Sequence, residues 1–127
     1  MKARVLLVED HPVLQVELTE MLGTLFEVAA VRATAADAIA WLRANPDGWD
    51  VAVVDIFLRQ GHGFDVLRQC GGRRDGQSVV MLSNYTREPA RSSALNLGAD
   101  AVFDKGFEME GFWSWCEQRA GKVASTA

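Results

Sequence analysis

The sequence predicts an α/β protein in which a parallel sheet carries helices on both of its faces. Short apolar runs rich in valine alternate five times with segments whose apolar residues recur at helical spacing, and this alternation is typical of a parallel sheet. Each run also leads into polar or charged residues. Because right-handed crossovers place the carboxyl ends of parallel strands at one edge, we expect the functional site there.

The composition fits one domain with a substantial core. The chain has 127 residues, of which 49% are hydrophobic and 24% charged, and a formal net charge of -4. This acidic balance argues against general binding to nucleic acids or membrane surfaces. No apolar run approaches the roughly 18 residues of a membrane-spanning helix, and Cys70 and Cys116 lack metal-binding spacing. We therefore expect a cytoplasmic domain with two free thiols.

Five segments are predicted to be strands. The clearest is 51–54, Val-Ala-Val-Val, where every residue is apolar and suited to burial on both faces of a sheet. It leads directly into Asp55, a carboxylate that needs a partner or a function if it is buried. The other predicted strands are 4–8, 26–31, 78–82 and 101–103.

A helix is predicted after each of these strands. The first begins at Pro12, with Asp10 placed to cap it, and ends at Gly23. Thr34 is expected to cap the second. The later predicted helices are 35–44, 64–70, 87–97 and 108–120. We assign residues 1–120 to one domain and residues 121–127 to a flexible tail.

Five polar side chains that follow strands are expected to converge at one edge of the sheet: Glu9, Asp10, Asp55, Ser83 and Lys105. Three carboxylates held together repel one another unless a cation is present. Hard oxygen ligands suit Mg²⁺, which also bridges to phosphate oxygens. A hydroxyl and an ammonium group nearby suit an incoming phosphoryl group, which Asp55 can accept as a nucleophile. The spacing alone does not choose among phosphotransfer reactions.

In these motifs the chain resembles response-regulator receiver domains, the phosphoacceptor modules of two-component signalling, over about residues 3–120. Five motifs in the family's order carry the resemblance. They are Val8-Glu9-Asp10-His11-Pro12, Asp55-Ile56-Phe57-Leu58, Gly61 with Gly63-Phe64, Leu82-Ser83-Asn84, and Gly98-Ala99-Asp100 followed by Asp104-Lys105. The resemblance implies a doubly wound, flavodoxin-like fold, with five parallel strands in the order 2-1-3-4-5 and five helices.

The resemblance also implies what the site residues do. Asp55 accepts a phosphoryl group from a histidine kinase, a phosphotransfer protein or a small donor such as acetyl phosphate. Asp10 holds Mg²⁺ directly and Glu9 holds it largely through water, with Asp55 and the backbone carbonyl of Phe57 as further ligands.

The same resemblance implies how phosphorylation is read. Ser83 is the switch hydroxyl that hydrogen-bonds one phosphoryl oxygen, and Lys105 pairs with another. The rearrangement shifts a surface formed by the fourth helix, the fifth strand and the fifth helix, which a protein partner or a second copy reads. Such a receiver promotes its own phosphorylation and is not an enzyme acting on an outside substrate.

Two residues depart from the family's switch pattern. Val102 stands three positions before Lys105, where the family usually has an aromatic residue, and Phe103 follows it. A one-residue offset in a strand turns a side chain to the opposite face, so we expect Phe103 to pack in the core under a helix. Gly106 replaces the family's proline, and no cis peptide bond is expected between Lys105 and Gly106.

Other side chains near the predicted site have two interpretations. Phe57 and Tyr85 are either ordinary loop aromatics or rings that exclude water and prolong the life of an aspartyl phosphate. His62 is expected to be a solvated loop residue rather than a proton shuttle, and His11 to belong to the start of a helix. The last helix raises a similar question, because its tryptophans either pack at the helix shoulder or form a partner surface. These tryptophans are Trp113 and Trp115.

We expect a stand-alone receiver; two alternatives stay open at this point, and a third is disfavoured. The chain could be a phosphorylation-independent interaction module that keeps the fold, or the receiver part of a longer regulator with an output domain after Ala127. A nucleotide or flavin binder is disfavoured because no Gly-x-Gly-x-x-Gly or Gly-Lys-Ser/Thr run follows a strand. The acids Glu9 and Asp10 would also repel a flavin phosphate.

Overall fold

The computed structural model of the protein describes residues 2–126, with side chains up to residue 122. Its sheet has five parallel strands in the order β2-β1-β3-β4-β5, which confirms the predicted fold. The strands are β1 (Arg4–Val8), β2 (Glu27–Arg32), β3 (Val51–Val54), β4 (Ser78–Ser83) and β5 (Ala101–Asp104). The helices are α1 (Pro12–Gly23), α2 (Ala35–Ala44), α3 (Gly63–Gln69), α4 (Ala90–Asn96) and α5 (Met109–Thr126).

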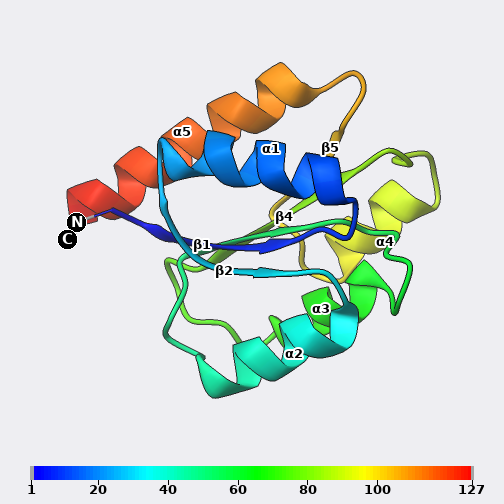
Figure 1. The fold of residues 1–127 in the computed structure, drawn as a ribbon, viewed down its shortest axis with the longest axis horizontal. Coiled ribbons are helices and arrows are strands. Elements are labelled where there is room, and N and C mark those ends of the chain that lie inside the picture. Colours follow the sequence, from blue (N-terminus) through cyan, green and yellow to red (C-terminus); the bar gives the residue numbers. More distant parts are fainter. Residues whose placement is uncertain (1, 127) are drawn as a thin grey trace.

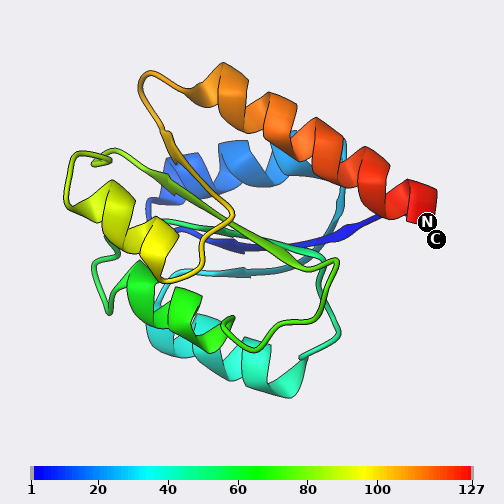
Figure 2. The ribbon, with the colours of Figure 1, turned by 180° about the vertical axis from the view of Figure 1, so that it is seen from behind.

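Helices cover both faces of the sheet, so its central strands are buried. α1 and α5 lie on one face, whereas α2, α3 and α4 lie on the other (Figure 1, Figure 2). Every residue of β3 and β4 is buried, as expected for strands that have a neighbour on each side and helices on each face. Alternate residues of β3 enter two separate apolar cores: Val51 and Val53 face the α1 side, and Ala52 and Val54 face the α2 side.

The starts of the first two helices follow local capping chemistry, with one correction to the prediction. Thr34 caps α2, because its hydroxyl accepts a hydrogen bond from a first-turn backbone N–H at 3.1 Å. His11 caps α1 in the same way through Nδ1, at 3.3 Å. The prediction that Asp10 caps α1 is therefore wrong. The Asp10 carboxylate instead accepts a hydrogen bond from the backbone N–H of Arg59 at 2.6 Å.

Two helix boundaries also differ from the prediction. α4 begins at Ala90, because Pro89 disfavours helical backbone in the residue before it. α5 continues to Thr126, so the predicted tail 121–127 begins inside this helix and ends outside the described residues. The flexibility of that segment stays a prediction. Among residues 2–126, no helix combines the length and the apolar sequence needed to cross a membrane.

Both cysteines are buried free thiols, as predicted. Burial raises the pKa of Cys70 to about 11 and the pKa of Cys116 to about 12. Because the thiolate is the reactive form of cysteine, both side chains are inert near neutral pH and serve as small apolar groups in the core.

Candidate functional site

The strand ends bring together the polar side chains that the sequence predicts there. Glu9, Asp10 and Asp55 offer carboxylate oxygens that all lie within 4.8 Å of one another. Lys105 Nζ lies 2.6 Å from Glu9 Oε1 and 3.1 Å from Asp55 Oδ2. The segments after β1, β3 and β5 thus supply three acids and one base to a single site.

The site carries an excess of negative charge. Three carboxylates and one ammonium group leave a formal excess of two negative charges. The side chains of Glu9, Asp55 and Lys105 are only 2%, 9% and 8% exposed, so water screens this excess poorly. Oxygen ligands of this number and charge fit a divalent cation such as Mg²⁺.

The surroundings of Asp55 disfavour its ionised form. Burial raises the pKa of its carboxyl above the ordinary value of 3.8, Lys105 opposes that effect through its charge, and the charge of Glu9 reinforces it. The Lys105 hydrogen bond and a bond from the backbone N–H of Phe57, at 3.3 Å, also favour the carboxylate. Burial nevertheless outweighs these contacts, so the carboxylate benefits from further positive charge nearby.

Gly63 allows the loop after Asp55 to fold directly against the site. A Cβ atom at this position would lie 2.1 Å from the carbonyl oxygen of Asp55 and 2.8 Å from the Cα atom of Ile56. No side chain fits in that space, and the Gly63 backbone N–H donates to the Ile56 carbonyl at 2.8 Å. The sequence motif included Gly63, but the close approach that requires a glycine depends on tertiary structure.

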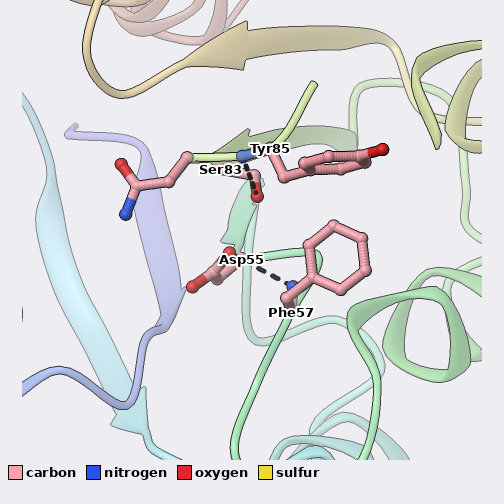
Figure 3. A pocket seen from close by; sticks show the side chains of 5 residues that line it. Asp55, Phe57, Ser83 and Tyr85 are labelled. Atoms are coloured by element: carbon pink, nitrogen blue, oxygen red, sulfur yellow. Dashed lines mark hydrogen bonds between the residues drawn. The ribbon is translucent and has the colours of Figure 1, made fainter. Parts of the chain in front are cut away.

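Ser83 lies beside an open pocket next to Asp55 (Figure 3). The pocket has a volume of about 440 Å³, and its lining residues are Asp55, Phe57, Ser83, Asn84 and Tyr85. The Ser83 hydroxyl is buried and accepts a hydrogen bond from the backbone N–H of Tyr85 at 3.2 Å. A hydroxyl that accepts this bond keeps its own hydrogen for donation to a ligand in the pocket.

Two aromatic rings flank this pocket, as the sequence predicts. Phe57 and Tyr85 meet edge to face, with ring centroids 5.5 Å apart and planes at 80° (Figure 3). The two residues are 46% and 47% exposed, so their rings form the rim of the pocket rather than its floor. The hypothesis that these rings slow the entry of water stays a prediction.

The expectation that His62 is a solvated loop residue is wrong. His62 caps α3, because its Nδ1 accepts a hydrogen bond from the backbone N–H of Phe64 at 3.0 Å. Its half-buried ring also meets Phe57 edge to face, with centroids 5.3 Å apart. His62 therefore supports the ring at the rim of the pocket.

The residues that depart from the switch pattern lie as expected. Val102 is buried in the core under α2, α3 and α4, whereas Phe103 packs on the opposite face against the core under α1 and α5. The Phe103 ring meets Phe112 of α5 at a centroid distance of 6.1 Å. The peptide bond between Lys105 and Gly106 is trans.

The tryptophans of α5 are both half-buried. Trp115 packs against the core under this helix, and the Arg119 guanidinium lies 5.2 Å from its ring centroid. Packing at the helix shoulder is thus confirmed for Trp115. Trp113 stays a candidate for a partner surface.

Known proteins with similar sequences or structures include response regulators and receiver domains. Residues 5–114 match the family described as the response regulator receiver domain. The DNA-binding transcriptional activator DevR/DosR of Mycobacterium tuberculosis is 32% identical over 80% of this chain and 47% of its own length. The chain thus spans about half the length of the curated relatives that it matches first.

Solved receiver domains share the fold. A CheY-like receiver domain protein from Methanospirillum hungatei JF-1 has a TM-score of 0.82 and 22% identity, with all of both chains covered. The receiver domain of the sensor histidine kinase PA1611 from Pseudomonas aeruginosa PAO1, a structure with magnesium in its active-site cleft, has a TM-score of 0.77 and 22% identity. Its match covers 95% of this chain and 99% of that one. The chain therefore belongs to the response regulator receiver domains, the phosphoacceptor modules of two-component signalling.

Proposed function

We propose that Asp55 receives a phosphoryl group from a phosphohistidine, presented by a histidine kinase or a phosphotransfer protein. The observation that carries the proposal is the position of Lys105, whose ammonium group joins Glu9 to Asp55 beside the pocket that Ser83 lines. A carboxylate nucleophile, a cation and a hydroxyl around one open space meet the needs of phosphoryl transfer. A small donor such as acetyl phosphate would serve in the same way.

Transfer depends on Mg²⁺ in this proposal. Asp10 and Asp55 would hold the ion directly, Glu9 largely through water, and the backbone carbonyl of Phe57 would be a further ligand. The fit of the three carboxylates is supported by oxygens within 4.8 Å of one another and by an excess charge equal to that of a divalent cation. Bound Mg²⁺ supplies positive charge that offsets the charge of the phosphoryl oxygens. The magnesium in the PA1611 receiver supports this assignment.

The protein's own residues would carry an in-line displacement. A carboxylate oxygen of Asp55 attacks phosphorus as the P–N bond of the phosphohistidine breaks, and the electron pair of that bond returns to the donor imidazole. Lys105 stays protonated and pairs with one phosphoryl oxygen. Ser83 donates its hydroxyl hydrogen to another, while it continues to accept from the backbone N–H of Tyr85.

Phosphorylation would then change a surface formed by α4, β5 and α5, which a downstream protein or a second copy of the chain reads. The chain would modify itself and not an outside substrate, and it would act in the cytoplasm without direct contact with nucleic acid or membrane. Its net charge of -4 supports the last point. In a longer regulator, residues 1–120 would form the receiver domain, and residues 121–127 would lead to an output domain.

Mass spectrometry after incubation with acetyl phosphate and Mg²⁺ tests this function. We expect the mass of one phosphoryl group to be added to the wild type, and none to be added in EDTA or to Asp55→Asn. Asp75→Asn makes the same charge change at an exposed position and is expected to behave as the wild type. Addition of the same mass to Asp55→Asn would contradict the assignment of the nucleophile.

The competing function is an interaction module that does not depend on phosphorylation. Val102 in place of an aromatic residue and Gly106 in place of a proline favour it. Absence of modification with acetyl phosphate, and absence of beryllofluoride binding in Mg²⁺, would support this alternative.

A further inference from the structure

Asp104 organises the turn that carries Lys105. It is the last residue of β5, and its Oδ1 accepts hydrogen bonds from the backbone N–H groups of Gly106 at 2.7 Å and Phe107 at 3.1 Å. These bonds lower the pKa of the Asp104 carboxyl, with the Gly106 bond as the largest cause. A carboxylate thus fixes a turn that has no proline to restrict its backbone.

The second oxygen of the same carboxylate reaches the loop after β4. Asp104 Oδ2 accepts a hydrogen bond from the Thr86 hydroxyl at 3.1 Å. Thr86 lies three residues past Ser83, beyond the end of β4. The turn after Lys105 and the loop after Ser83 therefore share one side chain, in addition to the backbone bond from Lys105 N–H to the Ser83 carbonyl at 2.9 Å.

Glu108 and Arg91 extend this connection to α4. The Glu108 carboxylate accepts a hydrogen bond from the backbone N–H of Asp104 at 3.0 Å and forms an ion pair with the Arg91 guanidinium. Arg91 also donates to the carbonyls of Thr86, at 3.3 Å, and Val102, at 3.0 Å. We call Asp104, Thr86, Glu108 and Arg91 the Asp104 clasp.

We propose that Asp104 is a positioning residue for phosphoryl transfer, which holds Lys105 and Ser83 in register through the Asp104 clasp. The inference rests on the proposed function. The family usually has a proline directly after the lysine and an aromatic residue three positions before it. This chain has Gly106 and Val102 at these positions, so both of these features are missing. Polar contacts fix the turn after Lys105 instead, and the same contacts reach α4 through Arg91. Contacts of a phosphoryl group with Ser83 and Lys105 would thus affect the position of α4.

Separate affinities for Mg²⁺ and for beryllofluoride, a phosphoryl mimic, test this role by titration calorimetry. Asp104 contacts neither the three site carboxylates nor the pocket, so Asp104→Ala is expected to bind Mg²⁺ within about twofold of the wild type. Its affinity for beryllofluoride in saturating Mg²⁺ is expected to fall about tenfold, which equals about 1.4 kcal/mol. The rate of phosphorylation by acetyl phosphate should fall by a similar factor.

Two further variants separate positioning from a general structural effect. Asp104→Asn keeps an oxygen that can accept from both N–H groups of the turn, so it should recover most of the lost affinity for beryllofluoride. Thr86→Val removes only the link to the loop after Ser83, and we expect it to lower that affinity by about threefold. If Asp104→Ala fails to fold, the beryllofluoride affinity of Thr86→Val tests the inference instead.

The outcomes of this experiment are distinct. Wild-type affinity for beryllofluoride in both Asp104→Ala and Thr86→Val would overturn the inference. An equal loss of Mg²⁺ and beryllofluoride affinity would also overturn it, because the effect would then be a general disturbance of the site. If the wild type itself binds no beryllofluoride in Mg²⁺, the proposed function fails and not only the role of Asp104.

Discussion

Replacing Asp55 with asparagine is expected to stabilise the protein in the absence of metal, although the change removes an ion pair. The Asp55 side chain is buried, and its pKa is raised chiefly because burial disfavours the charge. Its ionised form therefore opposes folding at neutral pH. The neutral amide removes this opposition, while Lys105 keeps its contact with Glu9 at 2.6 Å.

The expected gain in free energy of unfolding is about 1–3 kcal/mol, the usual penalty for a buried polar group without full compensation. For a chain of 127 residues, an unfolding entropy of about 2.1 cal/mol/K per residue makes 1 kcal/mol worth roughly 4 °C in Tm. The Tm of Asp55→Asn is thus expected to lie about 4–11 °C above that of the wild type in EDTA.

The pH dependence has a defined sign. Because the folded-state pKa of Asp55 is raised, its ionisation destabilises the folded wild type above that pKa. The wild type recovers this stability as the pH falls through the raised pKa toward the ordinary value of 3.8. The Tm difference between Asp55→Asn and the wild type is therefore expected to shrink over that range.

Mg²⁺ is expected to narrow the same difference at neutral pH. A ligand at a hundred times its Kd stabilises the folded state by about 2.7 kcal/mol, and Asp55→Asn gains less because it lacks one of the three site carboxylates. Calorimetry in EDTA and in Mg²⁺ measures both effects, with Asp75→Asn as the exposed control, expected within about 0.5 kcal/mol of the wild type. A lower Tm for Asp55→Asn than for the wild type in EDTA would refute the reasoning, since the Asp55–Lys105 pair would then contribute more than burial costs.

Four further substitutions test other parts of the site. Phe57→Asn and Tyr85→Ala remove the rings at the rim of the pocket and are expected to shorten the life of the aspartyl phosphate; unchanged decay in a phosphate-release assay would exclude a barrier to water. Gly63→Ala places a methyl group 2.1 Å from the Asp55 carbonyl oxygen, so urea unfolding should show a loss of about 1–3 kcal/mol or more. Lys105→Met leaves two buried carboxylates without their cation and should cost about 3–5 kcal/mol in the same assay without Mg²⁺. A loss below 1 kcal/mol, the level of an exposed pair, would show that the lysine is not needed for stability.

The sequence allowed the sheet and the site to be predicted because both depend on simple periodic features. β3 is apolar at every position, so its burial on two faces follows from its composition. Parallel connection then forces its carboxyl end to the same edge as those of β1 and β5. For this reason the sequence alone predicts that Asp55, Glu9 and Lys105 lie together.

The errors occurred where local signals compete with contacts distant in sequence. Asp10 and His11 are both able to cap α1, and no local pattern shows that the Asp10 carboxylate is already bonded to the backbone N–H of Arg59. His62 is predicted to lie in a loop because it has a glycine on each side, and glycines are typical of loops. α3 nevertheless begins at the second of these glycines, Gly63. The contact between Thr86 and Asp104 joins residues 18 positions apart, and neither side chain has a periodic signal.

The burial of the Lys105 contacts has a consequence for how the protein responds to ionic strength. Mobile ions weaken interactions between charges that face the solvent, but they screen much less the charges of Lys105, Glu9 and Asp55, whose side chains are less than a tenth exposed. Salt is therefore expected to change how often a charged donor protein meets this chain, and to leave the phosphorylation rate with a small donor almost unaltered. Salt would thus adjust the recognition of a donor protein at the surface far more than the charge interactions at the buried reaction centre.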